Sequence, residues 1–239
     1  MAIATNVYLK GSRQGEGASP VPTACANSGC EFFEKAAHNK PLGPVLKFDR
    51  NGTVYHRGEA AHYCYKVLEG AVRISRVLVD GHRQILNFVL PGETFGIELA
   101  DHYTADAEAV RGAMLLRCPR GCISHLAAHE PVQCQKLMAM LSDGMSAAQD
   151  HVILLSQQSA LERVAAFLLR LAANGSGNAR IIEVPMQRQD MADYLSLTLE
   201  TTCRSLTELK NRRLISIPNR RQIRIHSISG LEVLLAPHV

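Results

Sequence analysis

Residues 187–204 decide the fold, and their sequence is QRQDMADYLSLTLETTCR. The segment 188–195 predicts a short amphipathic helix with Met191, Ala192 and Leu195 on its apolar side. Thr198 is a good N-cap for a second helix, which we expect to extend to about Asn211. Two short helices joined by a three-residue turn are typical of a helix-turn-helix.

The residues after these helices predict two short strands. The segments 214–217 and 223–225 are rich in isoleucine and flank the turn residues Pro218 and Asn219. We therefore expect a winged helix-turn-helix. The inner face of its second helix should consist of Thr202, Leu206 and Leu209.

Positive charge is concentrated in the same region. The whole chain has a formal net charge of +4 and a sequence pI of about 8.7. Between Cys203 and His226 there are seven basic residues and one acidic residue, a local net charge of +6. A solvated helix end would account for a charge run on its own. Beside a helix-turn-helix pattern, the same charge favours binding to DNA phosphates.

Glu200 and Arg204 are four residues apart near the start of the second predicted helix, so they share one exposed face. One interpretation is a surface ion pair worth about 0.3–0.5 kcal/mol. The other is base recognition, because arginine donates two hydrogen bonds to guanine and a carboxylate accepts from the amino group of cytosine or adenine. A glutamate near DNA phosphates is unfavourable unless it contacts a base, which favours recognition.

Upstream of this region the pattern is that of an antiparallel barrel, sandwich or roll. From Val45 to Pro119, short apolar runs alternate with turn residues at roughly ten-residue spacing. Asn51-Gly52 and Asp80-Gly81 predict hairpins, and Pro91-Gly92 predicts a further turn.

A helical period follows from Glu130 to Gln157, and Ser159 and Glu162 form a capping box that begins another helix. Six apolar residues are spaced alternately by three and four positions, as in a coiled coil. They would either pack on their own domain or form a parallel dimer interface. The predicted dimerisation residues are Met138, Leu141, Met145, Ala148, Val152 and Leu155.

The 239 residues thus divide into four predicted parts: a flexible segment 1–40, a sensor-like β-roll 41–128, a dimerisation helix 129–157 and a DNA-binding domain 158–239. No apolar run approaches 18 residues, and no secretory signal is recognisable, so we expect no membrane segment and a cytoplasmic location. The odd count of seven cysteines argues against a disulfide framework.

The helix-turn-helix sequence resembles that of the Crp/Fnr transcription regulators, and the order of the predicted parts matches that family from about Lys40 onward. The spacing of Glu200, Cys203 and Arg204 resembles the Fnr and FixK branch. The resemblance implies an α+β protein: a cyclic-nucleotide-binding-like β-roll, a long dimerisation helix and a C-terminal winged helix-turn-helix. Ser196 replaces the usual turn glycine, Gln187 is a weaker helix cap than the usual serine or threonine, and Cys203 replaces a serine.

The resemblance also implies a homodimer that binds double-stranded DNA at a TTGAT-N4-ATCAA-like palindrome, recruits RNA polymerase and controls oxygen-limitation, nitrogen-fixation or respiration genes. Glu200 and Arg204 would contact bases, and Leu199 a thymine methyl group. The full set of candidate DNA-binding residues is Arg188, Thr198, Leu199, Glu200, Cys203, Arg204, Arg212, Arg213 and Arg220.

What the protein senses is a separate question. Asp106 and Glu108 stand where cyclic-nucleotide-binding relatives carry the phosphate-binding arginine, so binding of a cyclic nucleotide is not expected. The iron–sulfur cluster of Fnr needs four cysteines, whereas the N-terminal run here has only Cys25 and Cys30, with Cys118 slightly past the distal position. We expect no cofactor and no metal, and control largely by the amount of protein, as the FixK resemblance implies. An Fnr-like cluster and a small ligand in the β-roll remain alternatives.

Two further hypotheses concern reactive side chains. Cys203, near a helix N-terminus and Arg204, is a candidate for oxidation that would place negative charge against DNA; alternatively it is a plain contact residue. A rival interpretation is a metal enzyme in the β-region, and its support is four scattered histidines: His56, His62, His82 and His102. No two of them are close enough in sequence to form a His-x-His metal-binding pair. We therefore do not expect an enzyme.

Overall fold

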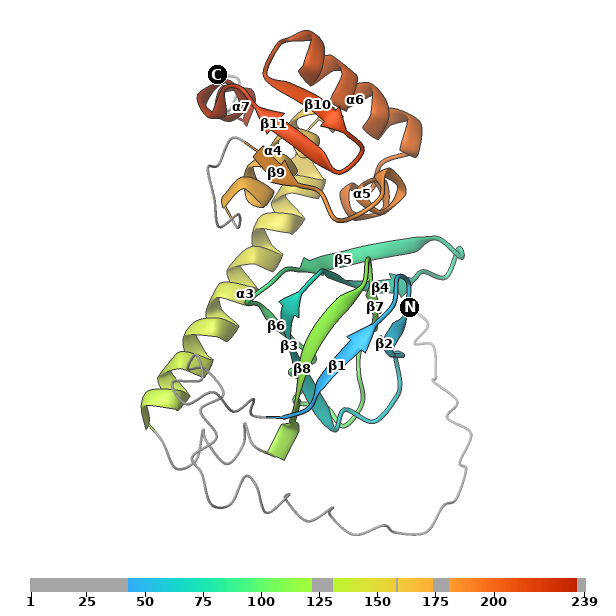
Figure 1. Ribbon diagram of the computed structural model, residues 1–239, viewed down its shortest axis with the longest axis vertical. Helices are drawn as coiled ribbons and strands as arrows, with labels where there is room; N and C mark the ends of the chain where they lie inside the picture. Colours follow the sequence, from blue (N-terminus) through green and yellow to red (C-terminus); the bar gives the residue numbers. More distant parts are fainter. Residues whose placement is uncertain (1–42, 122–130, 158, 174–180, 236–239) are drawn as a thin grey trace, which may run out of the picture.

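A computed structural model describes residues 43–121, 131–157, 159–173 and 181–235 (Figure 1). The N-terminal part is a β-roll of two four-stranded antiparallel sheets. One sheet has the order β1 (Val45–Phe48), β8 (Ala113–Pro119), β3 (Tyr63–Glu69) and β6 (Thr94–Phe95). The other has the order β2 (Thr53–Tyr55), β7 (Asp106–Ala109), β4 (Val72–Val77) and β5 (Arg83–Val89). The predicted β-roll is confirmed, while the predicted segment 1–40 lies outside the described residues.

Aromatic rings fill the space between the two sheets. Tyr55 and Tyr103 stack with their ring centroids 3.6 Å apart at an interplanar angle of 7°. Tyr65 and Phe95 stack at 5.3 Å, and all four side chains are buried. Burial raises the pKa of Tyr55 and of Tyr103 above the ordinary value, so both phenols stay neutral. The interior of the roll is therefore a packed aromatic core.

The two predicted hairpins have different outcomes. The Asp80-Gly81 hairpin is confirmed, because β4 and β5 pair from Val72–Val89 to Val77–Arg83 and Gly81 adopts a φ of 82°. The Asn51-Gly52 hairpin is wrong. The turn itself forms, with Asn51 at a φ of 60°, but β1 pairs with β8 and β2 pairs with β7. Asn51 and Gly52 thus carry the chain from one sheet to the other.

Helix α3 (Pro131–Gln157) runs along the side of the β-roll and leads into α4 (Ala160–Ala173) (Figure 1). The predicted capping box is confirmed: the backbone N–H of Ser159 donates to the Glu162 carboxylate at 2.8 Å, and the Glu162 N–H donates to Ser159 Oγ at 3.3 Å. No helix among the described residues has the length and hydropathy of a membrane span.

The C-terminal part is a winged helix-turn-helix. It contains α5 (Arg188–Leu195) and α6 (Leu199–Asn211), followed by the wing strands β10 (Ile215–Asn219) and β11 (Gln222–Ile225). Both predicted helices and both predicted strands are confirmed. Two elements had not been predicted: strand β9 (Ile181–Glu183), which pairs with β11, and helix α7 (Ile228–Leu235), which anchors Leu231 in the core.

A second hydrophobic core spans the junction between the β-roll and the winged helix-turn-helix. Helix α5 lies against strand β5 (Figure 1). Phe88 of β5 contacts Tyr194 of α5 and Phe167 of α4, with ring centroids 5.4 and 6.1 Å apart. Because the two parts bury aromatic surface against each other, helices α5 and α6 have a defined position relative to the roll.

Candidate DNA-binding interface

Helix α6 begins with a satisfied cap. Thr198 has an extended backbone, and its Oγ1 accepts a hydrogen bond from the backbone N–H of Thr201 at 3.1 Å. The cap satisfies one of the amide groups that the first turn leaves unpaired. The cap thus stabilises the first turn of α6, which carries Leu199 and Glu200.

The turn before α6 depends on Ser196. Its φ of 51° and ψ of 47° lie in the left-handed region, which favours glycine and strains other residues. The Leu197 N–H donates to the Ala192 carbonyl at 3.0 Å, and Ser196 Oγ donates to Gln84 Oε1 of strand β5 at 3.0 Å. The serine that replaces the expected glycine thus contacts the β-roll.

Four of the predicted DNA-binding residues form one exposed face of α6. These four residues are Leu199, Glu200, Cys203 and Arg204. The predicted inner residues lie on the opposite face, where each is at most 3% exposed. That buried face consists of Thr202, Leu206 and Leu209, with Ser205 beside them. Burial of one face against α4 and α5 leaves the other free for a partner.

Glu200 and Arg204 form an ion pair on the exposed face. Arg204 Nη2 lies 2.5 Å from Glu200 Oε1, and the two side chains are 76% and 79% exposed. A pair so exposed contributes little to stability. It does hold the two charged groups next to each other on the exposed face.

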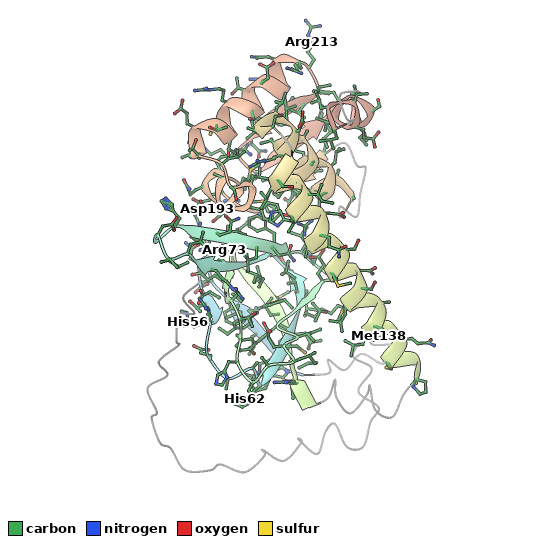
Figure 2. The ribbon with its side chains drawn as sticks, turned by 180° about the vertical axis from the view of Figure 1, so that it is seen from behind. His56, His62, Arg73, Met138, Asp193 and Arg213 are labelled. Atoms are coloured by element: carbon green, nitrogen blue, oxygen red, sulfur yellow. The ribbon has the colours of Figure 1, made fainter. Side chains whose placement is uncertain are left out.

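The remaining predicted residues divide into two groups. Arg188 and Arg220 lie with Leu199 along one groove beside the start of α6. Arg212 and Arg213 lie at the other end of this 13-residue helix, about 20 Å away at 1.5 Å per residue. Arg212 pairs with Glu208 at 2.8 Å, and Arg213 projects from the end of the molecule farthest from the roll (Figure 2). These two cannot act together with the groove on the same phosphates.

Sequence reasoning missed a charged network that fixes helix α5 on the β-roll. Arg73 of β4 contacts Glu108 at 2.9 Å and Asp190 at 3.1 Å. Arg83 of β5 contacts Asp190 at 2.8 Å and Asp193 at 2.6 Å. Figure 2 shows Arg73 and Asp193 at the junction of the two parts. Asp190 and Asp193 lie more than 100 residues from these arginines in the chain, so local sequence carries no signal for the contacts across the junction.

The arrangement explains why Arg73 and Asp190 can be buried. Their side chains are only 8% and 4% exposed, and each charge faces an opposite charge. Burial alone would lower the pKa of Arg83, but the hydrogen bond to Asp193 and the charge of Asp190 raise it overall. Asp190 also accepts from the backbone N–H of Gln187 at 3.1 Å and so supports the start of α5.

The β-roll offers no metal centre within the part of the chain that the structure describes. His56 lies 3.4 Å from Asp106, and His62 sits edge-on to Tyr63 in a different part of the roll (Figure 2). Cys118 is buried directly opposite Cys64, whose thiol lowers the pKa of Cys118 through a hydrogen bond. Cys25, Cys30 and Cys122 lie outside the described residues.

Comparisons with known proteins agree with this architecture. Residues 45–130 match the cyclic nucleotide-binding domain family, and residues 162–234 match the Crp-like helix-turn-helix domain family. The chain is 40% identical over 190 residues to the nitrogen fixation regulation protein FixK of Rhizobium meliloti, covering 80% of this chain and 86% of that protein. It is 39% identical over 197 residues to FixK of Azorhizobium caulinodans, covering 81% and 79%. The structure of FixK2 from Bradyrhizobium japonicum superposes with a TM-score of 0.78 at 34% identity, over 82% of this chain and 98% of that one.

The fold, the matched domain families and these relatives define a helix-turn-helix transcription regulator rather than an enzyme. The chain belongs to the Crp/Fnr family, in its FixK-like branch. The resemblance predicted from residues 187–204 is thereby confirmed.

Proposed function

We propose that the protein is a homodimeric regulator that binds a palindrome of the TTGAT-N4-ATCAA kind through α6. The observation that carries this proposal is the face of α6 formed by Leu199, Glu200, Cys203 and Arg204, held rigid by the Thr198 cap. A carboxylate and a guanidinium one turn apart can recognise a C·G pair through the cytosine amino group and the guanine O6 and N7 atoms. Leu199 supplies apolar contact for a thymine methyl group.

The dimer would form along helix α3. Met138, Met145 and Val152 are 65%, 62% and 66% exposed, and Leu141 and Ala148 between them are exposed as well. Only Leu155, at the end of the seam, is half-buried. A continuous apolar seam of this kind favours the dimer interpretation over packing on the helix's own domain, because the described residues of the chain leave it uncovered.

The regulated genes would be those for nitrogen fixation, respiration and other responses to oxygen limitation. Two FixK proteins that share 39–40% identity with this chain are named for nitrogen fixation regulation, and a 34% identical relative from Rhodopseudomonas palustris is named a transcriptional activatory protein. We accordingly propose an activator that acts in the cytoplasm and recruits RNA polymerase once bound to DNA.

We further propose that neither a cyclic nucleotide nor a cofactor is needed for DNA binding. Asp106 and Glu108 lie on β7, where their charges oppose a phosphodiester, and Glu108 already pairs with Arg73. The aromatic core formed by Tyr55, Tyr65, Phe95 and Tyr103 occupies the space between the sheets, which disfavours a small ligand there.

A gel-shift titration tests the function. Purified protein should shift a duplex containing TTGAT-N4-ATCAA at nanomolar concentration without any added ligand. A duplex of the same length and composition with both half-sites scrambled should bind at least about 1,000-fold more weakly. This factor is the usual lower limit of the ratio between specific and non-specific affinity. Equal binding to both duplexes would contradict sequence-specific recognition.

A further inference from the structure

A pocket of about 430 Å³ lies where helices α3, α4 and α5 meet, and no residue of α6 lines it. Its volume is within the range of about 300–1,000 Å³ that is typical of small-molecule sites. The aliphatic and aromatic residues that line it are Ala147, Ile153, Leu154, Ala166, Phe167 and Tyr194, and the others are Asp150, His151 and Arg170. The pocket therefore combines a largely apolar wall with one acidic and one basic side chain.

Arg170 of α4 brings a positive charge to this pocket. Its guanidinium donates to the Tyr194 hydroxyl and, at 2.6 Å, to Asn87 Oδ1 of strand β5, and both acceptors are neutral. Among the residues that the structure describes, no carboxylate lies within 4.0 Å of the Arg170 guanidinium. A guanidinium has five N–H donors, so donors remain for a further acceptor. The charge of Arg170 is thus held in place by hydrogen bonds but is not neutralised.

Asp150 of α3 brings the opposite charge. Its side chain is exposed, and within the described ranges it makes no hydrogen bond or ion pair. Asp150 and Arg170 line the same pocket, yet their charged groups are not within 4.0 Å of each other. A ligand that carries both charges can therefore form a charge-assisted hydrogen bond with each of them.

His151 adds an aromatic ring to the pocket but no charge at neutral pH. Burial lowers the pKa of His151 below its ordinary value, and the nearby charge of Arg170 acts in the same direction. The imidazole stacks on the Tyr194 ring with the centroids 4.1 Å apart, and the Phe167 ring lies 5.4 Å from that of Tyr194. Phe167 and Tyr194 are buried, so the core holds their rings in place.

We infer that this pocket binds a free α-amino acid with an apolar side chain. The carboxylate accepts from Arg170, the ammonium group donates to Asp150, and the side chain packs against Leu154 and Phe167. A carboxylate without an ammonium group leaves Asp150 unpaired, and an amine without a carboxylate leaves Arg170 unpaired.

A bound amino acid connects α3 to α4 and α5, so its binding stabilises the packing of these three helices. The inference does not depend on the proposed function, because the pocket is lined neither by α6 nor by the exposed apolar seam of α3, which contains Met145, Ala148 and Val152. DNA binding and amino-acid binding can therefore be tested separately.

Isothermal titration calorimetry on the whole chain tests the inference, with L-phenylalanine and L-leucine as probes. Two analogues each lack one charge: 3-phenylpropionate has no ammonium group, and 2-phenylethylamine has no carboxylate. The variant Asp150→Asn removes the acidic partner. The matched control is Asp143→Asn, which removes the same charge from an exposed position about two turns earlier on α3 that does not line the pocket.

We expect both amino acids to bind saturably with one site per chain. Each analogue should bind at least about tenfold more weakly than L-phenylalanine, because it leaves one charge of the pocket unpaired. Asp150→Asn should weaken L-phenylalanine by about tenfold but bind 3-phenylpropionate no more weakly than the wild type does. A structural defect would weaken both ligands alike, so this change of preference is specific to direct contact. Asp143→Asn should match the wild type with every ligand.

The inference would be overturned if neither amino acid bound saturably, or if the wild type bound L-phenylalanine and 3-phenylpropionate equally well. Weakening of both ligands alike in Asp150→Asn, or equal weakening of L-phenylalanine in Asp150→Asn and Asp143→Asn, would also overturn it. A wild type that binds L-phenylalanine but not the TTGAT-N4-ATCAA duplex would refute the proposed function alone. One that binds the duplex but neither amino acid would refute this inference alone.

Discussion

Arg83 Nη2 lies 2.6 Å from Asp193 Oδ2, and this ion pair joins strand β5 of the roll to helix α5 of the helix-turn-helix. It continues through Asp190 to Arg73 and Glu108, so charges from three strands of one sheet meet two carboxylates of α5. The network orients α5, and α5 supports the turn that begins α6. Ion pairs between the β-roll and α5 therefore help to set the position of helix α6.

The first prediction concerns Asp190, whose side chain is 4% exposed. Replacing it with asparagine keeps the size and one acceptor but leaves the buried guanidinium of Arg73 without one of its two carboxylates. We expect the free energy of unfolding to fall by about 3 kcal/mol, as is typical when one partner of a buried ion pair is removed. Urea denaturation followed by circular dichroism measures the change.

The control for this measurement is Asp101→Asn. Asp101 is 92% exposed and lies 3.8 Å from Arg120, so its loss should change the free energy of unfolding by less than about 1 kcal/mol. If Asp190→Asn and Asp101→Asn are equally stable, the network does not contribute to the junction as proposed.

The second prediction concerns base recognition. Arg204→Ala should weaken binding to the palindrome by about 1–3 kcal/mol, and Glu200→Ala should relax discrimination at one base pair of each half-site. The matched control is Glu208→Ala, since Glu208 and Arg212 form the same i,i+4 pair farther along α6. Gel shifts on single-base variants of the half-site measure both effects. Unaltered affinity and specificity in both Arg204→Ala and Glu200→Ala would refute the assignment of base recognition to these two residues.

The third prediction concerns the oligomeric state. Met145→Asp places a charge in the middle of the exposed seam of α3 and should convert the proposed dimer into a monomer, because the aspartate would be desolvated at the interface. Ser146→Asp adds the same charge on the exposed neighbouring position outside the seam and should leave the dimer intact. Sedimentation velocity distinguishes the two species. A wild-type protein that sediments as a monomer would be inconsistent with the dimer.

The fourth prediction concerns Cys203, which is exposed on the proposed recognition face. Peroxide should oxidise the thiol to a sulfenate or sulfinate and place negative charge against DNA, so that binding is lost. The Cys203→Ser variant should keep its affinity after the same treatment, whereas Cys64 and Cys118 are buried and remain in both proteins. Equal loss in the wild type and the variant would mean that oxidation acts at a residue other than Cys203, and unchanged binding by the treated wild type would mean that Cys203 is a plain contact residue.

The fifth prediction concerns pH. His151 of α3 stacks on Tyr194 at 4.1 Å, and its Nε2 lies 3.0 Å from the Tyr194 carbonyl oxygen. Burial lowers the pKa of His151 below 6.5, so the unfolded chain binds a proton more readily than the folded one. Stability should therefore decrease as the pH falls below about 6.5.

The variant His151→Gln isolates this contribution. It cannot take up a proton, so its stability should depend less on pH between about 6.5 and 5 than that of the wild type. Urea midpoints measured at several pH values provide the comparison. Parallel pH profiles for the two proteins would show that His151 does not titrate differently on folding.

Local chemistry was enough to predict the helix-turn-helix. The Thr198 cap, the apolar spacing of Met191, Ala192 and Leu195, and the basic run after Cys203 are all properties of neighbouring residues, and the helices formed where they were expected. The Asn51-Gly52 turn was also predicted, but not its partners. A turn type depends on two residues, whereas strand pairing depends on which distant strand offers the matching register.

The sequence by itself determined the order of roll, long helix and winged helix-turn-helix, together with the face of α6 that carries Glu200 and Arg204. Only the tertiary structure decided how the parts join. It placed Arg73 and Arg83 on Asp190 and Asp193, and it brought α3, α4 and α5 together around one pocket. The physical reason is range: caps and helical periodicity act within a few residues, but ion pairs between domains and pockets between helices depend on packing that no local pattern records.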